Sequence, residues 1–141
     1  MNEFVTFDIA KILNEKGFRE KCLAYYDVLD NVGLLYNTQY TDDISPCQYT
    51  DLLFSHNSGE GKQTDDSEYC VDAPTIEQVL TWMRKEKKIH LELVIVVDGE
   101  YMCDIYKIDV RPLECLGSTE YFKTYEQAAI AGIEYVIENI I

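Results

Sequence analysis

Four side chains that can exchange protons or bind a metal are predicted to meet on one face of a β-hairpin. The hairpin consists of strands 89–97 and 101–110, and the dipeptide Asp98-Gly99 between them is a strong turn signal. The four residues are His90, Glu92, Asp104 and Tyr106. They form a candidate catalytic site, although the same pattern is typical of the solvated face of a half-buried antiparallel sheet.

The register of this hairpin decides whether the four side chains meet. A two-residue turn would place Asp104 among core residues. A three-residue loop, 97–99, instead pairs Glu92 with Asp104 and His90 with Tyr106. We favour the second register because it gathers the apolar side chains on the opposite face. Those apolar side chains belong to Ile89, Leu91, Leu93, Ile95, Tyr101, Cys103 and Ile105.

A second, weaker constellation is Cys47, His56 and Cys70, which together have the side-chain types of a metal site. Their spacing matches no compact zinc-binding motif. The five cysteines include no CxxC pair, which indicates reduced thiols rather than a disulfide framework. The sequence also lacks Gly-rich phosphate loops, HExxH and GxSxG, so it indicates no cofactor and leaves enzymatic activity uncertain.

The strongest departure from average composition is the charge, which is −14 over 141 residues. Segment 37–72 holds eight acidic residues and one basic residue, and so contributes half of this charge. The segment shows no helical or strand period, which predicts an irregular acidic insertion. Its candidate interaction residues are Asp42, Asp43, Asp65, Asp66 and Glu68.

Elsewhere the chain alternates between helical and strand patterns. Helices are predicted at 7–16, 75–88 and 124–141, and β-hairpins at 21–36 and 89–110. Thr6 and Thr124 occupy N-cap positions, and Gly17 provides a left-handed stop. The connection 111–121 is predicted to be irregular.

These elements predict a single α+β domain over residues 1–141, in the order α-ββ-insertion-α-ββ-α. Because antiparallel hairpins need a covered face, we expect a two-layer sandwich in which about three helices cover an antiparallel sheet of the two hairpins.

The acidic charge argues against nucleic acid and membrane surfaces as direct partners, because these are polyanions. The acidic charge favours a protein partner, in particular one with a basic surface. No signal peptide or membrane-spanning run is evident, which predicts a cytoplasmic protein. The strand edge beside Val94 and Val96 is a possible site of self-association, so a homo-oligomer remains open.

Three stretches resemble a family of small uncharacterised acidic proteins from Bacteroidetes and their phages or mobile elements. They are TFDIAKILNEKGF (6–18), APTIEQVLTWMRKEKKIHLEL (73–93) and YFKTYEQAAIAGIEYVI (121–137). The resemblance covers about half of the chain and implies no activity, cofactor or catalytic residue, because none is assigned to the family. It implies a bacterial or phage origin.

Three functional hypotheses follow. The first is a non-enzymatic accessory protein that contacts another protein, which suits the acidic insertion and the eleven tyrosines. The second is a DNA mimic or anti-defence inhibitor, whose carboxylates would imitate phosphates. The third is a small enzyme or metal-binding protein that uses the outer face of the second hairpin.

Overall fold

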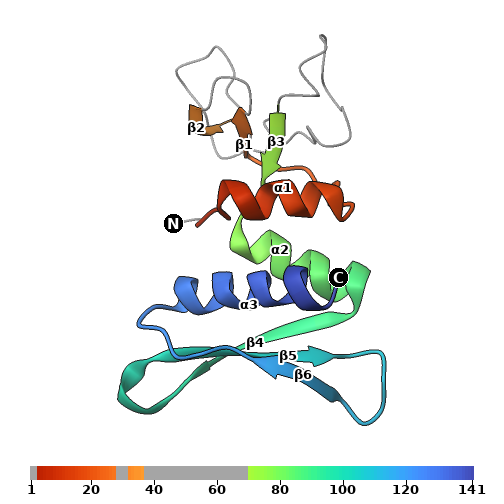
Figure 1. Cartoon of the computed structure of the whole chain (residues 1–141), viewed down its shortest axis with the longest axis vertical. Helices are drawn as coiled ribbons and strands as arrows, with labels where there is room; N and C mark the ends of the chain where they lie inside the picture. The colour runs from red at the N-terminus through yellow and green to blue at the C-terminus, as the bar shows by residue number, and fades with distance from the viewer. Residues whose placement is uncertain (1–2, 28–31, 37–69) are drawn as a thin grey trace, which may run out of the picture. The chain divides into compact units, whose positions relative to one another are not determined.

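A computed structural model describes residues 3–27, 32–36 and 70–141 of the chain (Figure 1). The chain divides into two compact units, Phe4–Thr75 and Met1–Glu3 with Ile76–Ile141. The expectation of one domain over residues 1–141 stays a prediction, and the greater part of the predicted insertion, residues 37–69, lies outside the described residues.

The unit Phe4–Thr75 combines one helix with one antiparallel sheet. Helix α1 (Phe7–Glu15) begins where the Thr6 hydroxyl accepts a hydrogen bond from the amide of Ile9 at 3.4 Å, and Gly17 follows the helix with φ +95°. Strands β1 (Ala24–Asp27) and β2 (Val32–Tyr36) form a hairpin, and β3 (Cys70–Ala73) pairs with the other edge of β1. The predicted cap, stop and hairpin are confirmed.

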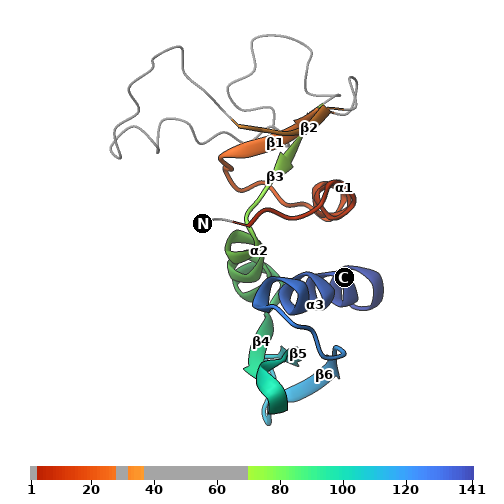
Figure 2. The same cartoon turned by 90° about the vertical axis from the view of Figure 1, so that its left-hand side faces the viewer.

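The unit that contains Ile76–Ile141 is a helical layer on a three-stranded antiparallel sheet (Figure 2). Helix α2 (Ile76–Trp82) continues as a π-helical segment (Met83–Lys87), and Lys88 alone joins that segment to strand β4 (Ile89–Ile95). A short 3₁₀ loop (Val97–Gly99) leads to β5 (Tyr101–Lys107), which pairs with β6 (Glu114–Ser118). Helix α3 (Tyr125–Asn139) lies along the sheet and contacts both β4 and β5.

The core of this unit lies between α3 and the sheet. Ile105 and Cys103 of β5 are 0% exposed, as are Ala128, Ala129 and Ile133 of α3. The helix and the sheet approach closely at Gly132, because a Cβ atom placed there would lie 2.5 Å from the Cys103 sulfur. Burial, with a smaller contribution from the Asp104 carboxylate, raises the pKa of Cys103 to about 12.

The predicted register of the second hairpin is confirmed. Glu92 pairs with Asp104 and His90 pairs with Tyr106, and the loop Val97–Gly99 has the predicted three residues. Both Asp98 and Gly99 in this loop have positive φ, at 68° and 74°. One member of the predicted apolar face is wrong: Ile95, beside the loop, is 68% exposed.

The α+β class, the three helices and the two hairpins are confirmed in the described residues, but the hairpins do not share a sheet. Each hairpin takes its own third strand, so the sheet orders are β2-β1-β3 and β4-β5-β6. The prediction of an irregular insertion over 37–72 is wrong at its end, where strand β3 begins. The prediction of an irregular connection over 111–121 is wrong at β6. Neither strand shows an alternating pattern: β3 is buried at three consecutive residues, and β6 lies at a sheet edge with no buried residue.

The predicted N-cap of α3 is confirmed, and it leads to a first prediction. The Thr124 hydroxyl accepts a hydrogen bond from the amide of Gln127 at 3.1 Å. Thr124→Ala leaves that amide without its acceptor, and should lower the free energy of unfolding by about 1 kcal/mol. Thr124→Ser, which keeps the hydroxyl, is the control in urea denaturation. Equal losses in both variants would contradict a capping role.

Among the described residues, no helix combines the length and the apolar character needed to cross a lipid bilayer.

Candidate functional site

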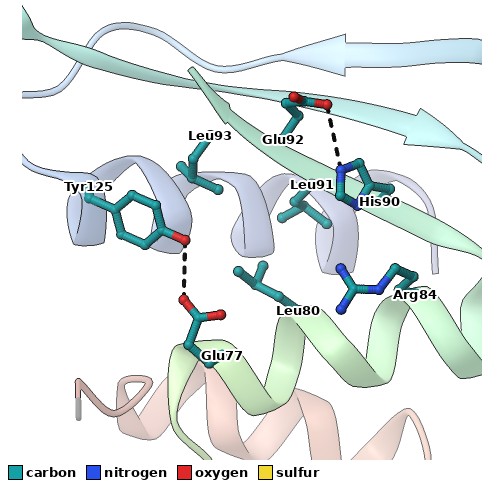
Figure 3. A pocket seen from close by; sticks show the side chains of 8 residues that line it. All are labelled: Glu77, Leu80, Arg84, His90, Leu91, Glu92, Leu93 and Tyr125. Carbon is teal, nitrogen blue, oxygen red and sulfur yellow. Dashed lines mark hydrogen bonds and ion pairs between the residues drawn. The ribbon is translucent and has the colours of Figure 1, made fainter. Parts of the chain in front are cut away.

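A groove of about 290 Å³ lies between α2 with its π-helical extension and strand β4 (Figure 3). Its middle is apolar, and its charged groups gather at the ends and along the rim. The lining residues are Glu77, Leu80, Arg84, His90, Leu91, Glu92, Leu93 and Tyr125. All of them belong to the unit of residues 76–141. We call this feature the β4 groove.

The helical wall of the groove consists of Glu77, Leu80 and Arg84. Side chains three and four residues apart share one face of a helix, so this spacing places an acidic, an apolar and a basic group in a row. Arg84 lies within the π-helical segment. Such segments occur mostly as single turns within α-helices, frequently at functional sites.

The opposite wall is the edge of β4, which pairs only with β5 among the described strands. The Val96 amide donates to Glu100 at 2.8 Å, and the Ile108 amide donates to the Lys88 carbonyl at 3.0 Å. Because hydrogen-bonded pairs alternate along an antiparallel ladder, the even-numbered residues of β4 bond to β5. The amides and carbonyls of Leu91 and Leu93 therefore point away from β5, toward the groove.

The two ends of the groove carry opposite charge. Figure 3 shows Arg84 beside His90 at the end where β4 begins, and Glu77 with Tyr125 at the other end. The Tyr125 hydroxyl donates to the Glu77 carboxylate at 3.1 Å. Burial, and then the charge of Glu77, raise the pKa of Tyr125 above its ordinary value. The phenol therefore stays a hydrogen-bond donor at neutral pH.

The structure brings the four candidate catalytic residues onto one face of the hairpin. His90 Nε2 lies 3.6 Å from a Glu92 carboxylate oxygen, and Asp104 accepts a hydrogen bond of 2.6 Å from the Ser118 hydroxyl. His90 and Glu92 line the β4 groove, whereas Asp104 and Tyr106 do not. The four residues therefore do not converge on one cavity, and their catalytic role stays a prediction.

Tyr106 allows a direct test of the electrostatics on this face. Its pKa is raised above the ordinary value, chiefly by the Asp104 carboxylate and then by burial, Cys115 and Glu92. Ionisation of Tyr106 is thus disfavoured in the folded protein, so any stability it contributes is fully present below its ordinary pKa and is lost as pH rises further. Asp104→Asn should lower the pKa of Tyr106, measured from its ring carbon shift by NMR. Asp109→Asn is the control, and an unchanged pKa in Asp104→Asn would contradict the assignment.

The other predicted site residues are placed only in part. Cys47, His56 and the interaction acids Asp42, Asp43, Asp65, Asp66 and Glu68 lie outside the described residues. Cys70 begins β3 and is half-buried. Within residues 3–27, 32–36 and 70–141, no three His, Cys, Asp or Glu side chains are arranged to hold a metal ion. The metal and interaction sites stay predictions.

Sequence reasoning missed the helical wall of the groove. The sequence predicts Leu80 as part of the apolar stripe of its helix, and this is confirmed, since Leu80 is 8% exposed. The sequence explains Arg84 only as a complement to the helix dipole. The spacing of Glu77, Leu80 and Arg84 is a signal for one mixed face, but only the tertiary structure places β4 opposite that face.

Comparison of the chain with protein-family models, with curated proteins and with solved structures finds no match. The resemblance to small acidic proteins of Bacteroidetes and their phages stays a prediction.

Proposed function

We propose that the protein is a non-enzymatic interaction protein, and that it binds an extended segment of another protein along the β4 groove. The main support is the coincidence of two features: an edge strand whose outward amides and carbonyls are unpaired within the described residues, and a groove with an apolar middle beside it. Added strands gain affinity from main-chain hydrogen bonds and specificity from alternate side chains.

The groove can provide an added strand with both main-chain hydrogen bonds and contacts for its alternate side chains. Leu91 and Leu93 carry the outward main-chain groups of the edge strand. Leu80 and Leu91, which are 8% and 5% exposed, form the buried floor of the groove, and the half-buried Leu93 contributes more of its apolar surface. Every second residue of an added strand would face this side. The remaining residues of that strand would lie beside His90 and Glu92. An origin in bacteria or their phages belongs to the same proposal and rests on the sequence resemblance alone.

The test uses peptides selected against the purified protein from a random decapeptide display library, then resynthesised and measured by calorimetry. Each peptide is made in two forms, with N-methyl groups on one or the other set of alternate residues. Because only alternate residues of an added strand bond to the edge, one set should weaken binding by about tenfold or more and the other by less than about threefold. Equal effects of both sets, or no selected peptide, would reject the proposal.

A matched pair of variants makes the same test by changing the edge strand of the protein instead of the peptide. Leu93→Pro removes the outward amide of the edge strand, while Leu93→Ala removes most of the same side chain and keeps the amide. The proline variant should lose peptide binding that the alanine variant retains in part, with folding checked by circular dichroism. Mass in solution shows whether a second copy, rather than a peptide, occupies the edge.

A further inference from the structure

We infer that the bound segment is the C-terminal end of its protein, running antiparallel to β4 with its terminal carboxylate at Arg84. This inference rests on the proposed function and adds the chemistry and direction of the ligand. It is based on two observations. The two ends of the groove carry opposite charges, and the helix and β4 converge at the end where β4 begins.

The cationic end of the groove is suited to a carboxylate. Arg84 is exposed, lines the groove and makes no hydrogen bond or ion pair within the described part of the chain. A guanidinium can bind a carboxylate through two parallel hydrogen bonds, which a lysine ammonium cannot do. An N-terminal ammonium at this end would be repelled by Arg84, which stays charged at any pH. The Glu92 carboxylate also lines the groove, but it lies 3.6 Å from His90 Nε2 rather than at Arg84.

The same end of the groove favours the end of a chain over its middle. Lys88 is the only residue between the π-helical segment and β4, so helix and strand converge where β4 begins. A strand that continued beyond Ile89 along this edge would meet the last turn of the helix. A strand that stops there places its carboxylate at Arg84, and since β4 starts at this point, the bound strand must run antiparallel to β4.

The anionic end then selects a residue near the terminus. Glu77 and Arg84 are separated by roughly 10 Å along the helix, from a rise of about 1.5 Å per residue. An extended chain covers that distance in about three residues. A basic side chain two residues before the terminus points to the same side of the strand as the terminal side chain, and can reach Glu77.

The probe is the synthetic peptide acetyl-Thr-Val-Thr-Lys-Thr-Val, compared with its C-terminal amide and with a form extended by Gly-Ser. We expect amidation and extension each to weaken binding by about tenfold, because either one removes the carboxylate from Arg84. In Arg84→Gln the amide and the free acid should bind within about twofold of each other. Lys85→Gln, an exposed neighbour that does not line the groove, should behave like the wild type.

Equal affinity of acid and amide for the wild type, or an amidation effect that persists in Arg84→Gln, would overturn the inference. Undiminished binding of the extended form would also overturn it, and would identify an internal segment as the ligand. The two N-methylated forms of the same peptide separate this failure from that of the proposed function. If their effects still differ, strand addition stands without the terminal carboxylate, whereas if they are equal, both proposals fail.

Discussion

Replacing Ile105 with alanine should lower the free energy of unfolding by about 2–5 kcal/mol, whereas the same change at Ile95 should lower it by less than about 1 kcal/mol. The hairpin register places both side chains on one face of the sheet. Only Ile105 is enclosed, since it is 0% exposed against 68% for Ile95. Truncation of Ile105 leaves a cavity beneath α3, while truncation of Ile95 removes surface that is already solvated.

Urea denaturation of the two variants measures this difference, with an unchanged slope showing that the unfolded state is the same. Val97→Ala, at a loop residue that is 84% exposed, is a further control with an effect close to zero. Similar losses at Ile105 and Ile95 would contradict the arrangement of α3 over the hairpin.

Gly132→Ala should also destabilise the protein, although alanine is the better helix former by about 1 kcal/mol. The added Cβ would lie 2.5 Å from the Cys103 sulfur and 3.0 Å from a methyl carbon of Leu91. The sulfur is buried and cannot move away freely, and overpacking of this kind costs about 1–3 kcal/mol. We therefore expect a net loss of up to about 2 kcal/mol.

A double-mutant cycle shows whether the sulfur is the cause. In a Cys103→Ala background the closest contact is gone, and Gly132→Ala should then be neutral or stabilising because the helix-propensity gain remains. Thermal and urea denaturation of the four proteins give the interaction energy. An equal loss from Gly132→Ala in both backgrounds would exclude close packing against Cys103 as its cause.

The hairpin register was predictable from the sequence because only one register buries Leu91 and Ile105 together without burying Asp104. Helix ends were predictable for a similar reason, since Thr6 and Thr124 bond locally to amides three residues ahead. Each of these features depends on residues that are close in the sequence or paired through a short loop.

Strand β3 was not predictable in the same way. It has four residues, includes the buried Asp72, and pairs with β1 across a long stretch of chain. An acidic residue at a buried position interrupts the hydrophobic pattern by which a strand is recognised. Because the partner strand is distant in the sequence, no turn signal joins the two. The short edge strand β6 includes Gly117 and no buried residue, so its sequence lacks the alternating hydrophobic pattern that predicts a strand.

Of the two walls of the β4 groove, only the residues on strand β4 were predictable from the sequence. The sequence placed His90 and Glu92 together, because strand alternation alone requires it. It could not place Arg84 and Glu77 opposite β4, since the packing of a helix beside a particular strand edge depends on the whole unit. The sequence also did not predict β6, whose pairing with β5 leaves β4 at the edge of its sheet.

Amide hydrogen exchange of β4, with and without a saturating selected peptide, tests the central claim most directly. In the free protein the amides of Glu92 and Val94, which bond to β5, should exchange slowly, and those of Leu91 and Leu93 should exchange faster. Bound peptide should slow exchange at Leu91 and Leu93 by about tenfold or more, and leave Glu92 and Val94 nearly unchanged. Exchange at Leu91 and Leu93 that stays fast while the peptide is bound would contradict strand addition at β4.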